Sequence, residues 1–277
     1  MMVLTPPTAL PAGQYSLTDL QGLSTGSGYY ATHAASSLGS IRQQAIQEAA
    51  QALGMQAALS YESIQIDQVL ESEGVLLNRI FDFNQVLYQH NVLPPVLDRA
   101  QNEVNINGTG DTIRIAGTTY RILAPVRFVT APPTWHDYIW MSYPPPELPN
   151  QVLLPQNDAE RQLWKANVAL GWAEGINQAV SIYQINLSRL VRDYNGMILY
   201  KELLAQNMVS PYHLTQQEQG ITGSGNNMVI DDKTMQITEQ PQLQLKGKLW
   251  ETAPISTNAP EPGAQGNLGN LSAQGAQ

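Results

Sequence analysis

The longest regular alternation of apolar and polar residues runs from Asp158 to Asp193. One set of its apolar positions recurs at spacings of three and four, as on one face of an α-helix: Leu163, Ala166, Leu170, Ala173, Ile176, Val180, Tyr183, Leu187, Leu190 and Tyr194. A second stripe has the same period: Trp164, Val168, Gly171, Trp172, Gly175, Ala179 and Ile182. A helix that is apolar on two faces is normally buried on both. This segment, roughly 50 Å long at 1.5 Å per residue, is therefore predicted to be the spine of the fold.

Residues at the two ends of this segment indicate where the helix begins and ends. Asn157 and Glu160 match a capping box, in which each side chain bonds to a backbone N–H of the first turn. Gly196 predicts a kink, after which the helical pattern continues to Met208 and stops before Pro211. Within the second stripe, Gly171, Trp172 and Gly175 form a candidate site of close packing, because the glycines allow another backbone to approach.

A second helical pattern precedes the first in the chain. Ser36 or Ser37 can cap it, and its apolar face comprises Leu38, Ile41, Ala45, Ala49 and Leu53. Gly54 interrupts this face. Helix is predicted to continue from Gln56 towards Phe81, and Pro94-Pro95 ends the region because proline cannot continue a helix interior.

Two short segments alternate with period two and predict β-hairpins. One follows Gly108-Thr109-Gly110-Asp111, with its tight turn expected at Ala116-Gly117. The other follows Gly223-Ser224-Gly225-Asn226, with its turn expected at Asp231-Asp232. The segments match position for position at an offset of 115 residues. Two readings stay open: an internal repeat in which each copy is a helix and a hairpin, or a chance likeness between hairpins.

These elements predict a single α+β domain over residues 38–250, in which long α-helices pack on a small antiparallel β-sheet formed by the two hairpins. Residues 1–37 are predicted to be an extended, flexible arm with one short ordered piece near Tyr15 to Leu23. Residues 251–277 are predicted to be a disordered tail. Both ends are rich in small and polar residues and almost uncharged, so they can bury too little apolar area to offset the entropy lost on ordering.

Composition narrows the possible functions. Charged residues make up only 13% of the 277 positions, and the formal net charge is -9. Only 14 residues are Lys or Arg, without a run of them, which argues against direct nucleic-acid binding. The chain has no Cys, so neither a disulfide nor a thiolate site is possible. No apolar stretch has the length of a membrane helix, and the first 37 residues lack the basic start of a signal peptide.

The sequence contains no pattern typical of a catalytic or metal centre. His33, His90, His136 and His213 lack the spacing of a metal helix, and neither a nucleophile elbow nor a phosphate-binding loop is present. The Gly-Ser-Gly and Gly-Thr-Gly triplets suit turns better than phosphate cradles. Glu71 and Glu73 face different ways on a helix. We therefore predict no catalytic, metal-binding or cofactor-binding residues, and a protein that is not an enzyme.

Aromatic residues and prolines are concentrated between residues 130 and 155. Rigid prolines beside aromatic rings make good contact surfaces, because little entropy is lost on binding. The candidate interaction surface comprises Trp135, Tyr138, Tyr143, Pro144, Pro145 and Pro146. In the alternative interpretation the segment drapes over the long helix and its aromatic residues complete the core. That alternative is favoured for Trp135 and Trp140, and the contact role is favoured for the proline run.

Several motifs in order carry a family resemblance. They are Asn91-Val92-Leu93-Pro94-Pro95-Val96-Leu97, Arg127-Phe128-Val129-Thr130, Pro132-Pro133-Thr134-Trp135, Gly171-Trp172, Gly196-Met197-Ile198-Leu199-Tyr200 and Asn207-Met208-Val209-Ser210-Pro211. Over roughly residues 38–237 the chain resembles the DotC family, called TraI on some conjugative plasmids, of type IVB (Dot/Icm-type) secretion systems.

The resemblance implies a structural lipoprotein at the periplasmic face of the outer membrane. Such a protein helps to build a multi-copy, ring-shaped core complex with DotD-like and DotH-like partners. Family members have a signal peptide and a lipidated Cys, and we expect this lipid anchor to be absent from the present chain. Two other classes stay open: a periplasmic ligand- or peptide-binding module, which needs a pocket lined by Tyr and Trp, and a cell-wall hydrolase, which needs clustered carboxylates.

Overall fold

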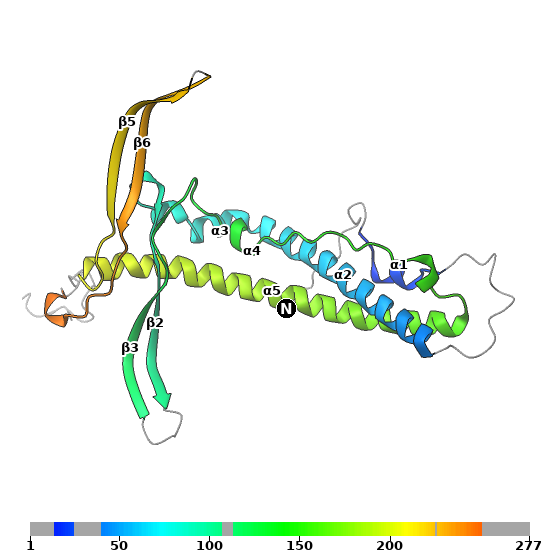
Figure 1. The fold of residues 1–277 in the computed structure, drawn as a ribbon. Helices are drawn as coiled ribbons and strands as arrows, with labels where there is room; N and C mark the ends of the chain where they lie inside the picture. Colours follow the sequence, from blue (N-terminus) through cyan, green and yellow to red (C-terminus); the bar gives the residue numbers. More distant parts are fainter. Residues whose placement is uncertain (1–13, 25–39, 107–112, 225, 251–277) are drawn as a thin grey trace, which may run out of the picture.

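Two long helices lie side by side and form a rod (Figure 1). The computed structural model describes residues 14–24, 40–106, 113–224 and 226–250. Its helices are α1 (Leu17–Gln21), α2 (Ser40–Ser72), α3 (Gly74–Ile80), α4 (His136–Ile139) and α5 (Asp158–Ala205), with short 3-10 turns η1 (Phe83–Gln85), η2 (Gln89–Asn91), η3 (Gln151–Leu153) and η4 (Gly247–Leu249). The strands are β1 (Val92–Leu93), β2 (Val96–Ile106), β3 (Ile113–Ala124), β4 (Arg127–Phe128), β5 (His213–Ser224) and β6 (Asn227–Glu239).

Helices α2 and α5 run in the same direction. Arg42, near the start of α2, donates to Glu160 at the start of α5 over 2.9 Å. Leu70 and Leu190 share a buried cluster nearer the other end of the rod. Parallel helices need a connection that travels back along them, so the topology itself creates a long return segment.

Helix α5 runs without a break from Asp158 to Ala205, three residues short of the predicted end of the helical pattern at Met208. It spans 48 residues, roughly 70 Å at 1.5 Å per residue. The kink expected at Gly196 is wrong, since the helix continues through it, and Gly54 lies inside the unbroken helix α2. Both glycines serve packing instead. A Cβ at Gly196 would lie 2.5 Å from the carbonyl oxygen of Leu97, and one at Gly54 would lie 2.5 Å from that of Val168.

The start of α5 confirms one half of the predicted capping box. The side chain of Asn157 accepts from the backbone N–H of Glu160 at 2.9 Å. The carboxylate of Glu160 accepts instead from the backbone N–H of Gln156 at 2.8 Å, one residue before the cap. This difference has a physical cause, because the same carboxylate is also held by two hydrogen bonds from Arg42.

Part of the predicted arm is packed against the rod. Within residues 14–24, Ser16 and Asp19 cap α1 reciprocally. The indole N–H of Trp164 donates to the carbonyl of Leu20 at 2.8 Å, and Leu20 is fully buried. The rest of residues 1–37 and the tail 251–277 lie outside the described residues.

The long helices, the antiparallel strands and the α+β class are as predicted. One detail differs, because the two hairpins do not share a sheet: β2 pairs only with β3, and β5 only with β6, within the described residues. The hairpins leave the same end of the rod in opposite directions (Figure 1). Their bases are joined where Gln240 donates to the carbonyl of Val126 at 3.2 Å and accepts from its N–H at 3.0 Å.

Both predicted turn positions are wrong. Ala116 and Gly117 lie inside β3, and the pairing of β2 with β3 extends to Ile106 and Ile113; residues 107–112 lie outside the described residues. The second closes after the pair Ser224 and Asn227. Gly220, with φ of 70°, pairs with Asp232, and the neighbouring Asp231, with φ of 59°, lies at an irregularity in the ladder. The positive φ values there mark a bulge rather than a chain reversal.

Each half of the chain is a helix followed by a hairpin, the order that a repeat would produce. The strand registers nevertheless differ. Ile113 pairs with Ile106 in the first hairpin, whereas Met228, its counterpart at an offset of 115, pairs with Gly223 rather than Ile221. The offset in the sequence is therefore not kept in the strand pairing.

Candidate interaction surface

The predicted close-packing glycines lie where α5 crosses α2. A Cβ at Gly171 would lie 2.1 Å from the carbonyl oxygen of Gln51, and one at Gly175 would lie 2.3 Å from that of Met55. Trp172 is half-buried beside the crossing, with its ring 5.4 Å from that of Tyr61. This face of α5 is thus occupied by α2 from the same chain.

The proline-rich region forms the return segment, residues 129–157, which runs back along α2. Its hydrogen bonds to the helices run in reverse chain order, first to Asn78 of α3 and then to three residues of α2. The indole N–H of Trp135 donates to Asn78 (3.0 Å), the N–H of Met141 donates to Asp67 (3.1 Å), the hydroxyl of Ser60 donates to the carbonyl of Tyr143 (3.0 Å), and Arg42 donates to the carbonyl of Val152 (3.0 Å). Prolines suit such a segment, because they lack an N–H and favour an extended backbone.

The six residues of the predicted interaction surface differ in how exposed they are to solvent. Pro144 and Pro145 are exposed, and Tyr138 and Tyr143 are half-buried. Trp135 is only 1% exposed and Pro146 is also buried. The structure therefore places Trp135 in the core, as the alternative interpretation favoured, and the contact role predicted for Pro146 is wrong. Trp135 belongs to the core because its ring packs among apolar residues while its N–H finds Asn78.

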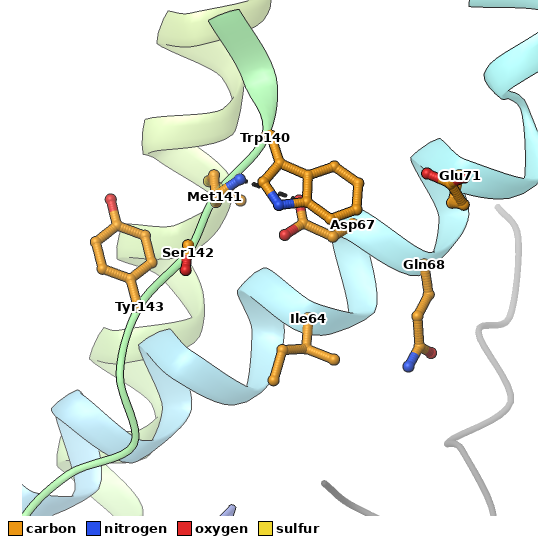
Figure 2. A pocket seen from close by; sticks show the side chains of 8 residues that line it. All are labelled: Ile64, Asp67, Gln68, Glu71, Trp140, Met141, Ser142 and Tyr143. Atoms are coloured by element: carbon orange, nitrogen blue, oxygen red, sulfur yellow. Dashed lines mark hydrogen bonds between the residues drawn. The ribbon is translucent and has the colours of Figure 1, made fainter. Parts of the chain in front are cut away.

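A groove lies between the second half of α2 and the start of the extended part of the return segment (Figure 2). Its volume is about 380 Å³, and it is lined by Ile64, Asp67, Gln68, Glu71, Trp140, Met141, Ser142 and Tyr143. Trp140 is 42% exposed at its rim, contrary to the core position favoured from the sequence. Aromatic and acidic groups thus meet on one accessible surface.

Asp67 carries the main charge at the base of this groove. It is buried, and burial raises the pKa of its carboxyl, although the hydrogen bond from Met141 and the nearby His136 act to lower it. Asp67 and Ser60 were not among the residues predicted from the sequence. Their signal was available: both are polar residues on the otherwise apolar face of α2, seven positions apart, which is two helical turns.

The β5–β6 hairpin offers a different kind of surface. Almost every residue of both strands is exposed. Beyond the bulge, Ile221, Met228 and Ile230 are 69%, 65% and 61% exposed. Two-stranded hairpins are marginal in water unless another layer covers them, and both outer strand edges here lack a neighbour within the described residues. This hairpin is therefore suited to being completed by a partner.

No metal site and no membrane-spanning helix were found in the described part of the chain. Groups of three or more His, Asp or Glu able to hold a metal ion are absent among residues 14–24, 40–106, 113–224 and 226–250. Across the same residues, none of the helices is both long and apolar enough to cross a bilayer.

The fold and its surfaces define a rod-shaped α+β protein with two projecting hairpins. A family model described as type IV secretory system, conjugal DNA-protein transfer (T4SS_TraI), matches residues 40–252. The chain belongs to this family. The resemblance seen in the sequence motifs is thereby confirmed at the level of type IV secretion. No curated protein matches the chain significantly.

Proposed function

We propose that this type IV secretion protein is a structural subunit of the outer-membrane core complex of a Dot/Icm-type secretion or conjugation system. The main support for this proposal is the exposed apolar surface of the β5–β6 hairpin. The hairpin projects from the rod (Figure 1) and exposes Ile221, Met228 and Ile230. A partner that covers these side chains would bury apolar area and extend a two-stranded ladder whose edges are otherwise open.

The expected partners are DotD-like and DotH-like core subunits and further copies of the chain in a ring. The location that accompanies this role is the periplasmic face of the outer membrane. A rod with two hairpins that project in opposite directions suits such an assembly, because it can contact neighbours on both sides while Gln240 and Val126 join the bases of the hairpins.

Co-purification from detergent-solubilised envelopes tests the proposal. The double variant Ile221→Thr/Ile230→Thr keeps β-branched residues in the hairpin but removes apolar surface. Val75→Thr is the matched control, because Val75 is 89% exposed on α3. We expect the hairpin variant to lose the other core subunits and conjugal transfer, and the control to keep both. Normal assembly of the hairpin variant would overturn the proposed contact.

The groove in Figure 2 favours a second candidate, a periplasmic peptide-binding module. It places Trp140 and Tyr143 beside two carboxylates, Asp67 and Glu71. Under this alternative, Trp140→Ala abolishes function while core-complex assembly stays normal. Under the structural proposal, assembly fails in the hairpin variant and survives in Trp140→Ala.

A further inference from the structure

A small pocket at the base of the first hairpin gathers positive charge in a protein of net charge -9. Its volume is about 150 Å³, and it lies among the loop before β2, the end of β3, the start of β4, α4 and α5. Three arginines line it: Arg127 from β4, and Arg189 and Arg192 from α5. Asp193 is the only acidic residue in the lining, so the lining has a formal charge of +2.

Asp193 does not satisfy all three guanidinium groups. It accepts from Arg192 at 2.8 Å and lies 3.9 Å from Arg189, beyond hydrogen-bonding distance. Arg189 is 64% exposed, and its guanidinium carbon lies 5.6 Å from the ring centre of Tyr138. Among the described residues, Arg127 and Arg189 have no hydrogen-bond acceptor. Each guanidinium therefore offers a planar set of N–H donors to an incoming anion.

The hydroxyl group of Tyr138 lies close enough to these charged side chains for them to affect its pKa. Burial raises the pKa of its hydroxyl, the charge of Asp193 raises it further, and the charges of Arg127 and Arg189 lower it. The charged residues of β4 and α5 therefore lie near the same hydroxyl group. Its ring stacks on Phe83 with a centroid separation of 5.7 Å, so core packing holds it in position.

The other walls of the pocket are apolar. Leu123, which is 45% exposed, and the exposed Pro125 form the accessible apolar wall, and the buried residues Leu93, Val96 and Met197 lie behind it. The pocket volume of about 150 Å³ exceeds the roughly 10–15 Å³ that a single water needs, so a group larger than one water fits. That volume matches a carboxylate with a short aliphatic stem. A bare phosphate would leave the apolar walls without contacts.

From this arrangement we infer that the pocket binds a carboxylate of an acidic peptide segment, with Arg127 and Arg189 pairing with its oxygens and the aliphatic stem lying against Leu123 and Pro125. Arginine pairs strongly with carboxylates because its donors match both oxygens. This inference concerns peptide binding by the isolated protein. It does not depend on the proposal that the β5–β6 hairpin binds core-complex subunits.

Fluorescence anisotropy with the full chain tests the site. The probe is a fluorescein-labelled glycine–serine peptide that carries several glutamate–leucine pairs, and the same peptide with glutamine is the uncharged comparison. Arg127→Gln and Arg189→Gln remove the acceptor-free guanidinium groups. Arg161→Gln is the matched control, because Arg161 is 43% exposed near the opposite end of α5 and, among the described residues, forms its ion pair with Asp158.

We expect each pocket variant to weaken binding of the glutamate peptide by about tenfold, the effect of losing one charge-assisted pair, while Arg161→Gln stays within about twofold of the parent. Circular dichroism should show unchanged folding, since Arg127 and Arg189 are exposed. In Arg189→Glu, preference should shift towards a lysine–leucine peptide.

Four outcomes would overturn the inference: no detectable binding of the glutamate peptide to the parent chain, equal binding of the glutamine peptide, an equal loss in Arg161→Gln, or tighter binding of another anion. For the last outcome, inorganic phosphate and phosphatidylglycerol vesicles are titrated separately. Preferred binding of phosphate would indicate a simple anion site, and preferred binding of vesicles would indicate a lipid-headgroup site.

Discussion

The backbone of Gly171 lies so close to that of Gln51 that a Cβ at position 171 would stand 2.1 Å from the Gln51 carbonyl oxygen. The contact joins the two long helices through their main chains. It leaves no room for even a methyl group, so the glycines at this crossing act through their lack of a side chain.

Gly175→Leu is therefore expected to destabilise the fold itself. Its Cβ would lie 2.3 Å from the carbonyl oxygen of Met55, and overpacking of this kind costs about 1–3 kcal/mol or more. Thermal melting should show a lower Tm. Gly117→Ala is the control, because a Cβ there meets nothing within 4 Å. If Gly175→Leu melts normally but no longer co-purifies with partners, this face of α5 is an interface between proteins.

Alanine substitutions of the two tryptophans in the return segment should have different effects on the free energy of unfolding. Trp135→Ala removes a side chain that is 1% exposed, and such truncations cost about 3–5 kcal/mol. Trp140→Ala, at a position 42% exposed, should cost less than about 1 kcal/mol. Chemical denaturation measures both. Equal losses would show that Trp140 also supports the core.

The ion pair between Arg42 and Glu160 predicts a pH dependence of stability. Burial alone raises the pKa of Glu160, but the hydrogen bonds from Arg42 and Gln156 outweigh it, so the pKa lies below its usual 4.5. A carboxyl with a lowered folded pKa stabilises above its unfolded pKa and loses that contribution as the pH falls through the folded pKa. In Arg42→Met, the free energy of unfolding should drop at pH 7 and fall less steeply below about pH 4.5. An unchanged acid profile would contradict the pairing.

The buried carboxyl of Asp67 predicts the opposite dependence of stability on pH. Burial raises its pKa above the usual 3.8, so the folded state favours the protonated form. Stability from this group is full below pH 3.8 and is lost as the pH rises through the folded pKa. Asp67→Asn keeps an acceptor for the Met141 N–H and removes the buried charge. It should raise the free energy of unfolding at pH 7, with no difference from the parent at acidic pH. Urea titrations at both pH values decide the matter.

Hydrogen exchange should show a gradient along the β5–β6 hairpin in the isolated protein. Amides beyond the bulge at Gly220 and Asp231 lie in an uncovered two-stranded ladder, so they should exchange quickly. Amides of α5 near Leu190, which is fully buried, should exchange slowly. In an assembled complex the distal hairpin should become protected. Strong protection in the monomer would mean that the hairpin needs no partner.

The sequence predicted those features that depend on short spacings. The period of three and four residues identified α5, and Asn157 marked its start. The turns were misplaced because Asp231 resembles a turn residue but occupies a positive φ at a bulge, a choice settled by the partner strand. Gly196 was misread for a similar reason: its role depends on Leu97, 99 positions away and invisible to any local pattern.

The candidate surface was harder to predict than the fold. A cluster of aromatic residues and prolines does not reveal which rings turn inward, and Trp135 and Trp140, five positions apart, have opposite exposures. The parallel orientation of α2 and α5 was equally hidden, because an apolar stripe can pack against a partner of either direction. Asp67 became notable only when the return segment brought the N–H of Met141 to it.

The parallel arrangement of the helices also shapes how the chain reaches this structure. The Arg42–Glu160 pair joins residues 118 positions apart, and the glycine crossing joins Gln51 to Gly171. Contacts between such distant positions require a large loop to close first, which slows folding. As the chain is synthesised, the first helix and hairpin must wait with an uncovered apolar face until α5 emerges. This topology therefore makes the half-made chain the form most exposed to aggregation.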